Sequence, residues 1–432
     1  MTSYTSLRTL GGFLEKFIQS SRNSAKQDLN LEPGRASCSG ESTIDSVSQI
    51  STLEVRVPPP PIRRSRQSFY RPELDVLRFF AFLGVFLFHA FSSAPAARGG
   101  PSWIAFANRL NYAGVFGVDL FFVLSAYLIT ELLLREKRQF GRLNIGAFYS
   151  RRILRIWPLY FFAIGLGLIP LFNPDHSFTW RYVGAFLLLA GNWSIVAWSW
   201  PTHTIVYPLW TVSIEEQFYL LWPPIVRKFS ANGLACTAVV MLALASAMRA
   251  VMIAIHAGRF SVWCNTLCRL DPIALGILVA VGLRGRIPNF SIGTRLAMLL
   301  GGTLPVVLIA NFWNLWVPKS LEWLPNLLGF PVVAVCCTLI LLAAIGISIK
   351  PPTPLVYLGR ISYGLYVYHV LGGFITGHFL FRAGVTHFRW LLLERSLALA
   401  VTVLLASVSY ALLEKPFLNL KKRFELVGSR PV

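Results

Sequence analysis

The sequence predicts an all-α fold, a polytopic membrane helical bundle with about ten transmembrane helices. Three observations predict this class. Hydrophobic residues make up 55% of the 432 residues, only 14% are charged, and the mean hydropathy is +0.57. Apolar stretches long enough to cross a bilayer recur from residue 76 to residue 413. These stretches are too continuous for barrel strands, so helices must satisfy the backbone groups that lipid leaves without partners.

Hydropathy marks eleven candidate spans, and the positions of Lys and Arg indicate on which side of the membrane each connecting loop lies. The candidates cover residues 76–95, 113–134, 156–172, 180–197, 210–226, 233–256, 270–284, 295–313, 324–346, 360–381 and 391–413. Residues 135–155 hold seven Lys or Arg and one Glu, so they belong on the cytoplasmic side. The remaining basic loops agree only if one candidate does not cross. We expect segment 180–197, which "GN" interrupts, to be re-entrant or to lie along the outer surface, where a broken backbone can line a cavity.

The chain divides into three parts by composition. Residues 1–70 are polar and end in "VPPPPIRRSRQSFYRP", which predicts a disordered basic cytoplasmic arm. Residues 71–420 form the expected membrane domain, and residues 421–432 form a short basic cytoplasmic tail. We therefore expect a multi-pass protein of the plasma (inner) membrane with both termini in the cytoplasm. Basic anchors at the inner face explain the net charge of +21 better than nucleic-acid binding does.

The cysteines predict little chemistry. Cys336 and Cys337 lie in an apolar helix and are interpreted as core thiols. Cys264 and Cys268 are separated by three residues, and no His cluster accompanies them, so no metal site is predicted. A disulfide between Cys264 and Cys268 stays an open alternative if that loop is extracytoplasmic.

Two residues of the first span are unexpected in lipid, where ionisable groups usually face an interior cavity and mark function. Arg78 and His89 are eleven residues apart. At ~100° per residue they share one helix face, with His89 ~16 Å deeper and too far in to reach the interface. Because imidazole is a natural general base near neutral pH, we predict that His89 is catalytic. The alternative is a packed histidine with a satisfied hydrogen bond.

The next span, "GVFGVDLFFVLSAYLIT", carries Asp119 and Ser125 among apolar residues. They are six residues apart and point to different faces, so no Ser–His–Asp triad is predicted. We interpret the Ser125 hydroxyl as bonded back to its own helix backbone.

Two arginines of "RRILRIWPLYF" are predicted to act together. Arg152 and Arg155 are three residues apart and therefore neighbours on one helix face, at the cytoplasmic end of the third span. A pair of guanidinium groups suits phosphates, and a cytoplasmic nucleotide or coenzyme A would supply them. The alternative is a pair of basic anchors at the inner face.

Two adjacent carboxylates, Glu215 and Glu216, begin a later crossing in "LWTVSIEEQFYLLWP". Carboxylates that enter lipid are costly. One of them can face solvent, whereas the other needs a partner inside, where it would accept a proton or orient His89. The neighbouring Trp210, Tyr219 and Trp222 fit an interfacial aromatic belt.

Taken together, these residues resemble the acyltransferase type 3 family of integral-membrane acyltransferases. The resemblance covers about residues 71–420 and rests on six motifs in order. They fall on Arg78 and His89 (Arg-x10-His), Gly117 to Tyr127, Arg152 and Arg155 (Arg-x-x-Arg), Trp210 to Pro223, Arg269 with Asp271 and Gly276, and Ile361 to His369. Ala126 replaces the usual glycine and Thr211 the usual serine, and both changes exchange one small residue for another.

The resemblance implies transfer of an acyl group, most often acetyl from acetyl-CoA, to a hydroxyl of a carbohydrate, a lipid-linked sugar or a glycosylated compound. Arg152 and Arg155 would hold the coenzyme A phosphates, with help from Arg78 at the mouth. His89 would deprotonate the hydroxyl or briefly accept the acyl group, and Glu215 would orient or charge-balance this centre. Acyl-CoA is then a donor substrate, and no permanently bound cofactor, metal or nucleic acid is expected.

Two alternatives remain open. A polytopic transporter of a small anionic or glycosidic compound would share the spans, the intramembrane charges and the broken segment, although no inverted repeat is visible. A non-catalytic membrane protein that binds lipid or sugar would keep the fold without the reaction. The hydrolase-like domain fused to some family members does not follow the last span, so we expect the membrane domain or a separate partner to handle the acyl acceptor.

Overall fold

The computed structural model of the chain describes residues 70–92, 109–201, 204–313, 315, 322–382 and 390–424. Residues 1–69 of the predicted basic arm and residues 425–432 of the predicted tail lie outside the described residues. All described residues belong to one compact unit, Arg66–Val432.

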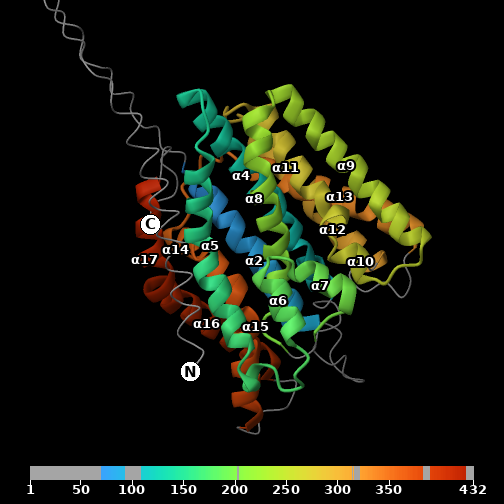
Figure 1. Cartoon of the computed structure of the whole chain (residues 1–432), viewed down its shortest axis with the longest axis vertical. Coiled ribbons are helices and arrows are strands. Elements are labelled where there is room, and N and C mark those ends of the chain that lie inside the picture. The colour runs from blue at the N-terminus through green and yellow to red at the C-terminus, as the bar shows by residue number, and fades with distance from the viewer. Residues whose placement is uncertain are drawn as a thin grey trace, which may run out of the picture. The chain divides into compact units, whose positions relative to one another are not determined.

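Helices joined by short connections make up the described part of the chain, which contains no strand (Figure 1). The longer helices are α2 (Pro72–Ser92), α4 (Gly117–Phe140), α5 (Ile145–Gly167), α8 (Trp210–Lys228), α9 (Ala231–Ala254), α11 (Leu270–Leu283), α12 (Ile292–Phe312), α13 (Trp323–Ala344), α15 (Ser362–Arg382) and α16 (Leu391–Ser409). The shorter elements are η1 (Ala113–Phe116), η2 (Pro170–Phe172), α6 (Trp180–Leu187), α7 (Gly191–Trp198), η3 (Tyr207–Leu209), α10 (Phe260–Trp263), η4 (Leu267–Arg269), α14 (Thr353–Arg360), the π-helical turn η6 (Tyr410–Glu414), α17 (Lys415–Lys421) and η7 (Lys422–Phe424). The predicted all-α class is confirmed.

Six helical segments of the described residues are long and apolar enough to cross a membrane, judged by length and composition. They are Pro72–Phe91, Arg109–Phe140, Ala231–Ala254, Ile292–Phe312, Trp323–Ala344 and Leu391–Phe424. Helices α5 and α8 have sufficient length, but α5 carries three arginines and α8 carries Glu215 and Glu216. Charged residues that face an interior cavity make such helices less apolar than the helices that face lipid. The number of about ten crossings therefore stays a prediction.

Helices α2 and α4 lie at the centre of this unit. In their most apolar windows 61% and 67% of the residues are buried, compared with 11% in α12. Helix α2 packs against α4, α13, α14 and α15, while α4 also contacts α8 and α11. Figure 1 shows α2, in blue, among these helices, with α9, α12 and α13 gathered to one side. Side chains of α2 and α4 are thus placed where an interior site can form.

Two glycine contacts fix the position of α2. A Cβ atom at Gly359 of α14 would overlap the backbone of Asp75, and one at Gly114 of η1 would overlap the carbonyl group of Gly84. Only glycine allows backbones to approach so closely. The start of the helix is also favourable, because Pro72 occupies its first turn with Glu73 close behind. These contacts determine where Arg78 and His89 lie.

The segment expected not to cross is split into two helices, α6 and α7, of eight residues each. Each spans ~12 Å, which is too short to cross a bilayer alone. The break lies just before the "GN" pair, at Leu189, which has a left-handed backbone conformation. The segment does not line the cavity described below, contrary to our expectation. Its Asn192 side chain instead binds the carbonyl group of Cys264, and this turns α7 toward the loop that precedes η4.

The described cysteines are free thiols. Cys336 and Cys337 are buried in the core as predicted, and so are Cys264 and Cys268. The structure therefore contains no disulfide between Cys264 and Cys268.

Candidate functional site

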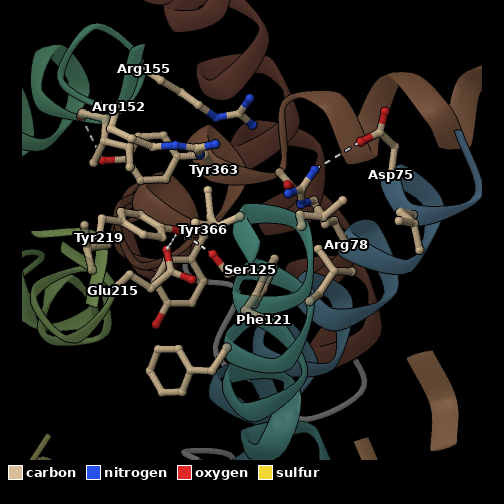
Figure 2. Close-up of a pocket in the computed structure, with 18 of the residues that line it drawn as sticks. Asp75, Arg78, Phe121, Ser125, Arg152, Arg155, Glu215, Tyr219, Tyr363 and Tyr366 are labelled. Carbon is tan, nitrogen blue, oxygen red and sulfur yellow. Dashed lines mark hydrogen bonds and ion pairs between the residues drawn. The ribbon is translucent and has the colours of Figure 1, made fainter. Parts of the chain in front are cut away.

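A cavity of about 170 Å³ lies inside the helical bundle. Its walls come from α2, α4, α5, α8 and α15 (Figure 2). Among the described residues that line it, six are basic (Arg71, Arg78, Arg151, Arg152, Arg155 and Lys421) and two are acidic (Asp75 and Glu215). The excess of positive charge suits an anionic ligand.

Arg78 enters this cavity from α2. Its Nη1 atom lies 3.3 Å from Oδ1 of Asp75, one turn earlier on the same helix. The hydroxyl of Tyr70 donates to the other oxygen of Asp75, at 3.0 Å. Figure 2 shows the guanidinium group of Arg78 pointing toward the cavity, across from Arg152 and Arg155.

Arg152 and Arg155 line the same cavity from α5, as their spacing predicts. The guanidinium group of Arg152 lies over the ring of Tyr219, with its carbon 5.3 Å from the ring centroid. Neither arginine forms an ion pair with a described residue, whereas the adjacent Arg151 pairs with Glu136 at 3.2 Å. Arg152 and Arg155 therefore present positive charge to the cavity without a direct ion pair to a described carboxylate.

Glu215 faces the cavity from α8, where we expected an acidic residue to act. Tyr219, one turn further on, donates a hydrogen bond to Glu215 at 3.1 Å, and the Tyr219 hydroxyl is also hydrogen-bonded to Ser125 of α4. Our interpretation that Ser125 bonds back to its own helix is wrong, because packing brings it a partner from α8. Glu215 forms no hydrogen bond to His89, so any effect of Glu215 on His89 is indirect.

Glu216 points away from the cavity and is buried. One of its carboxylate oxygens accepts a hydrogen bond from the indole of Trp157 at 3.1 Å. Both carboxylates of the pair thus lie inside the protein. The predicted interfacial belt is also wrong, because the bundle buries all three aromatic residues, namely Trp210, Tyr219 and Trp222. Trp222, for example, finds a partner in Thr130 of α4 at 2.9 Å.

His89 is not among the residues that line the cavity. Its Nδ1 atom lies 2.9 Å from the carbonyl oxygen of Val85. Its ring packs against the ring of His369 from α15, with centroids 5.0 Å apart, and against Tyr207 at 5.7 Å. His89 therefore points into the bundle toward α15, but it does not share the space occupied by the arginines.

Tyr366 connects the cavity with His89. It lines the cavity, and its ring lies 5.6 Å from the ring of His369, which in turn contacts His89. The hydroxyl of Tyr366 donates to the carbonyl group of Pro208 at 3.2 Å, and Thr211 donates to Tyr366 at 3.0 Å. The rings of Tyr366 and His369 thus form a chain of contacts from the cavity to His89.

Sequence reasoning missed the roles that Ser125, Tyr219, Tyr366 and His369 have in this geometry. Ser125 was assigned a bond to its own helix and Tyr219 a place in an interfacial belt, while Tyr366 and His369 were assigned no interaction. One signal was available for His369: it is a histidine in an apolar span, which is the feature that singled out His89.

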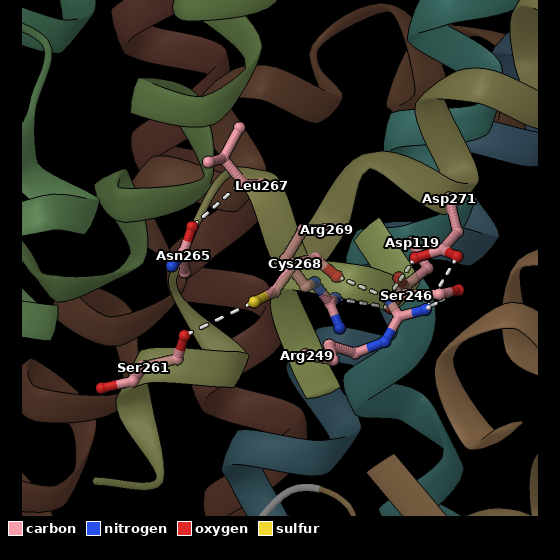
Figure 3. A network of polar contacts seen from close by, with 9 residues as sticks. All are labelled: Asp119, Ser246, Arg249, Ser261, Asn265, Leu267, Cys268, Arg269 and Asp271. Carbon is pink, nitrogen blue, oxygen red and sulfur yellow. Dashed lines mark hydrogen bonds and ion pairs between the residues drawn. The ribbon is translucent and has the colours of Figure 1, made fainter. Parts of the chain in front are cut away.

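A second polar cluster lies elsewhere in the bundle (Figure 3). Arg269 pairs with Asp119 at 2.9 Å, and Arg249 pairs with Asp271 at 2.5 and 3.1 Å. All four side chains are fully buried, and their charges balance. This cluster ties α4, α9 and α11 together and does not line the cavity. Asp119 thus has a structural partner in Arg269. No group of three or more His, Cys, Asp or Glu side chains in the described residues is placed to hold a metal ion.

The fold and the cavity define a multi-pass helical membrane protein with a basic interior site. The family model of the type 3 acyltransferase domain matches residues 71–414. The chain belongs to this family. The sequence-based prediction of the family is confirmed.

Two curated relatives illustrate the similarity. The O-acetyltransferase OatA of Staphylococcus aureus (strain NCTC 8325 / PS 47) is 25% identical over 388 residues, which cover 84% of this chain and 59% of OatA. A putative O-acetyltransferase of Staphylococcus aureus (strain MSSA476) is 25% identical over 378 residues, covering 81% of this chain and 57% of that protein. The chain thus spans less than two thirds of the length of these relatives. No solved structure gives a significant match.

Proposed function

We propose that this protein is an integral-membrane O-acyltransferase that moves an acyl group, in the first place acetyl, from a cytoplasmic acyl-CoA to a hydroxyl of a carbohydrate or glycosylated acceptor. The observation that carries this proposal is the interior cavity in which Arg152 and Arg155 form no ion pair with any carboxylate of the described residues. The names of the curated relatives, both O-acetyltransferases, support the type of reaction.

The cavity suits the donor in two respects. Coenzyme A carries phosphates, and guanidinium groups bind phosphate through paired charged hydrogen bonds. The wall formed by α4 is mostly apolar, with Phe121, Leu124 and Leu128 lining the cavity, and the ring of Phe121 contacts that of Tyr366. A donor whose phosphates bind to Arg152 and Arg155 would therefore direct its thioester along this wall toward the two histidines.

His89 is the base in this proposal. Its Nδ1–H donates to the carbonyl group of Val85, so the neutral ring carries its lone pair on Nε2. The Nε2 atom takes the proton of the sugar hydroxyl while the hydroxyl oxygen attacks the thioester carbon. The C–S bond then breaks, and the coenzyme A sulfur takes the proton from His89 to leave as the thiol. Glu215 and Tyr219 balance part of the positive charge at the donor end.

The proposal also assigns the two substrates to different ends of α2. Arg78 and His89 are separated by ~16 Å along this helix. The donor would approach from the end that carries the arginines, and the acyl acceptor would approach His89 from the other end. Exclusion of water between them would limit wasteful hydrolysis of the thioester.

Purified full-length protein in proteoliposomes, supplied with acetyl-CoA and candidate glycosides, tests this function. We expect a product heavier by one acetyl group in mass spectrometry. His89→Ala should lower turnover by ~10²–10⁴-fold, the usual contribution of general-base help, with membrane insertion unchanged. The matched control is His378→Ala, which alters an exposed histidine of α15 and should retain full turnover.

The same experiment separates the alternatives. Full transferase activity in His89→Ala would remove the proposed base. Uptake of a glycoside into the vesicles without any acylated product would favour a transporter instead. In cells, mass spectrometry of envelope glycans and secreted glycosides, with and without this protein, would identify the acyl acceptor.

A further inference from the structure

His369 is a buried histidine that packs against His89 inside the bundle. Its side chain is 3% exposed, and its ring centroid lies 5.0 Å from that of His89. Its Nε2 atom is buried and has no hydrogen-bond partner among the described residues. A buried polar atom without a partner is rare in folded proteins, and each case calls for an explanation.

The backbone fixes the proton positions on both rings. Nδ1 of His369 lies 2.6 Å from the carbonyl oxygen of Tyr366, and Nδ1 of His89 lies 2.9 Å from that of Val85. A carbonyl oxygen can only accept, so Nδ1 carries the hydrogen in each ring. Both neutral rings therefore keep a lone pair on Nε2, the ring atom that can accept a proton.

Because both histidines are surrounded by aromatic rings, a ring that becomes protonated needs a hydrogen-bond acceptor close by. Phe82 and Tyr366 pack against His369, and Phe88 and Tyr207 pack against His89. A charged imidazolium among aromatic rings is costly unless a hydrogen bond stabilises it. Glu215, which we expected to orient the base, lines the cavity and accepts a hydrogen bond from Tyr219.

We propose that His369 is a positioning residue that acts through His89. This inference rests on the proposed function. When His89 takes the hydroxyl proton, its Nε2–H donates to Nε2 of His369, and the two rings share the proton. The hydroxyl oxygen forms its bond to the thioester carbon and the C–S bond breaks. The thiolate then removes the proton from His89, and both rings return to the neutral state.

Chemical rescue of a cavity variant tests this role. His369→Ala in the full-length protein should lower kcat by about 10- to 100-fold, which corresponds to one hydrogen bond to a charged group. The KM for acetyl-CoA should stay unchanged, because Arg152 and Arg155 are untouched. Added imidazole should restore part of the lost kcat. Pyrrole, which has the same ring size and an N–H but no acceptor lone pair, should not.

A second variant keeps the test decisive if His369→Ala fails to fold. His369→Phe retains a ring of similar size and removes the lone pair, and it should show the same loss of kcat. His378→Ala on the same helix is again the matched control with full activity. Full kcat in His369→Phe, or equal rescue by imidazole and pyrrole, would overturn the proposal and leave a packing role.

The outcomes also distinguish this inference from the proposed function. If His89→Ala is inactive and both His369 variants are as active as the unaltered protein, only the role of His369 is wrong. If His89→Ala retains full activity, the proposed base is wrong, and the inference about His369 falls with it.

Discussion

Neighbouring arginines of α5 have different surroundings, although they look alike in the sequence. Arg151 is paired with Glu136 and also donates to the carbonyl group of Phe424 at 2.7 Å, so it holds the helix to its neighbours. Arg152 lies over an aromatic ring at the cavity wall, and its buried Nε atom has no partner among the described residues. An arginine without a carboxylate partner is available to an anionic ligand, whereas a paired arginine must first break its ion pair.

From this difference we predict that Arg152→Ala weakens the binding of acetyl-CoA. The affinity for acetyl-CoA should fall by about 10-fold or more, because a charged hydrogen bond to phosphate is lost. Isothermal titration with the protein in nanodiscs measures this affinity. The matched control is Arg286→Ala, which removes an exposed arginine outside the cavity and should leave the affinity unchanged. Equal affinity in both variants would make Arg152 a simple basic anchor.

At the scale of elements, glycine contacts position the helix that carries Arg78 and His89. Gly114 lets η1 reach the backbone of α2, and Gly359 lets α14 reach its first turn. Buried ion pairs fix α11 in turn, since Arg269 precedes it and Asp271 lies in its first turn. The positions of Arg78 and His89 thus depend on contacts between helix backbones outside the cavity.

Gly114→Ala should therefore destabilise the protein and reduce its turnover. The added Cβ would overlap the backbone of Gly84, which cannot rotate away, so we expect a loss of about 1–3 kcal/mol from overpacking. Thermal unfolding in detergent measures the loss. Gly165→Ala in α5 is the control, because nothing lies within 4 Å of the added atom. Equal melting temperatures in the two variants would contradict this account of α2.

At the scale of the whole described unit, basic side chains gather at one end of the helices. Lys137 donates to the carbonyl groups of Val226 and Phe229 at the end of α8. Arg295 does the same for Ala343 and Ile345 at the end of α13. Cations are favourable at the carboxyl ends of helices, and they also mark the cytoplasmic side. The arginines of the cavity lie toward this end, and His89 lies toward the other.

This arrangement predicts that transfer is sided. Acetyl-CoA does not cross a sealed bilayer, so it should support transfer only when it is added on the basic side. Inside-out and right-side-out vesicles that contain the protein allow the comparison, with product measured by mass spectrometry. Permeabilisation with mild detergent should abolish the difference. Equal rates in the two sealed preparations would show that the donor does not enter through the arginine end.

The sequence by itself determined the features that are local. Hydropathy gave the all-α class, because a helix in lipid must be apolar over its whole length. The helical period placed Arg152 and Arg155 on one face, and it singled out Arg78 and His89 as residues on one side of α2. The distribution of charge predicted which ends of the helices carry basic residues, because arginines and lysines in loops can be recognised without knowledge of their tertiary partners.

Only the tertiary structure decided which of these residues meet. Ser125 binds Tyr219 instead of its own helix, His89 contacts His369 instead of Glu215, and His89 lies beside the cavity that holds the arginines instead of within it. The partners in these contacts come from helices far apart in the chain. Their positions depend on how helix surfaces pack, including the close approaches at glycine, and neither hydropathy nor helical period contains that information.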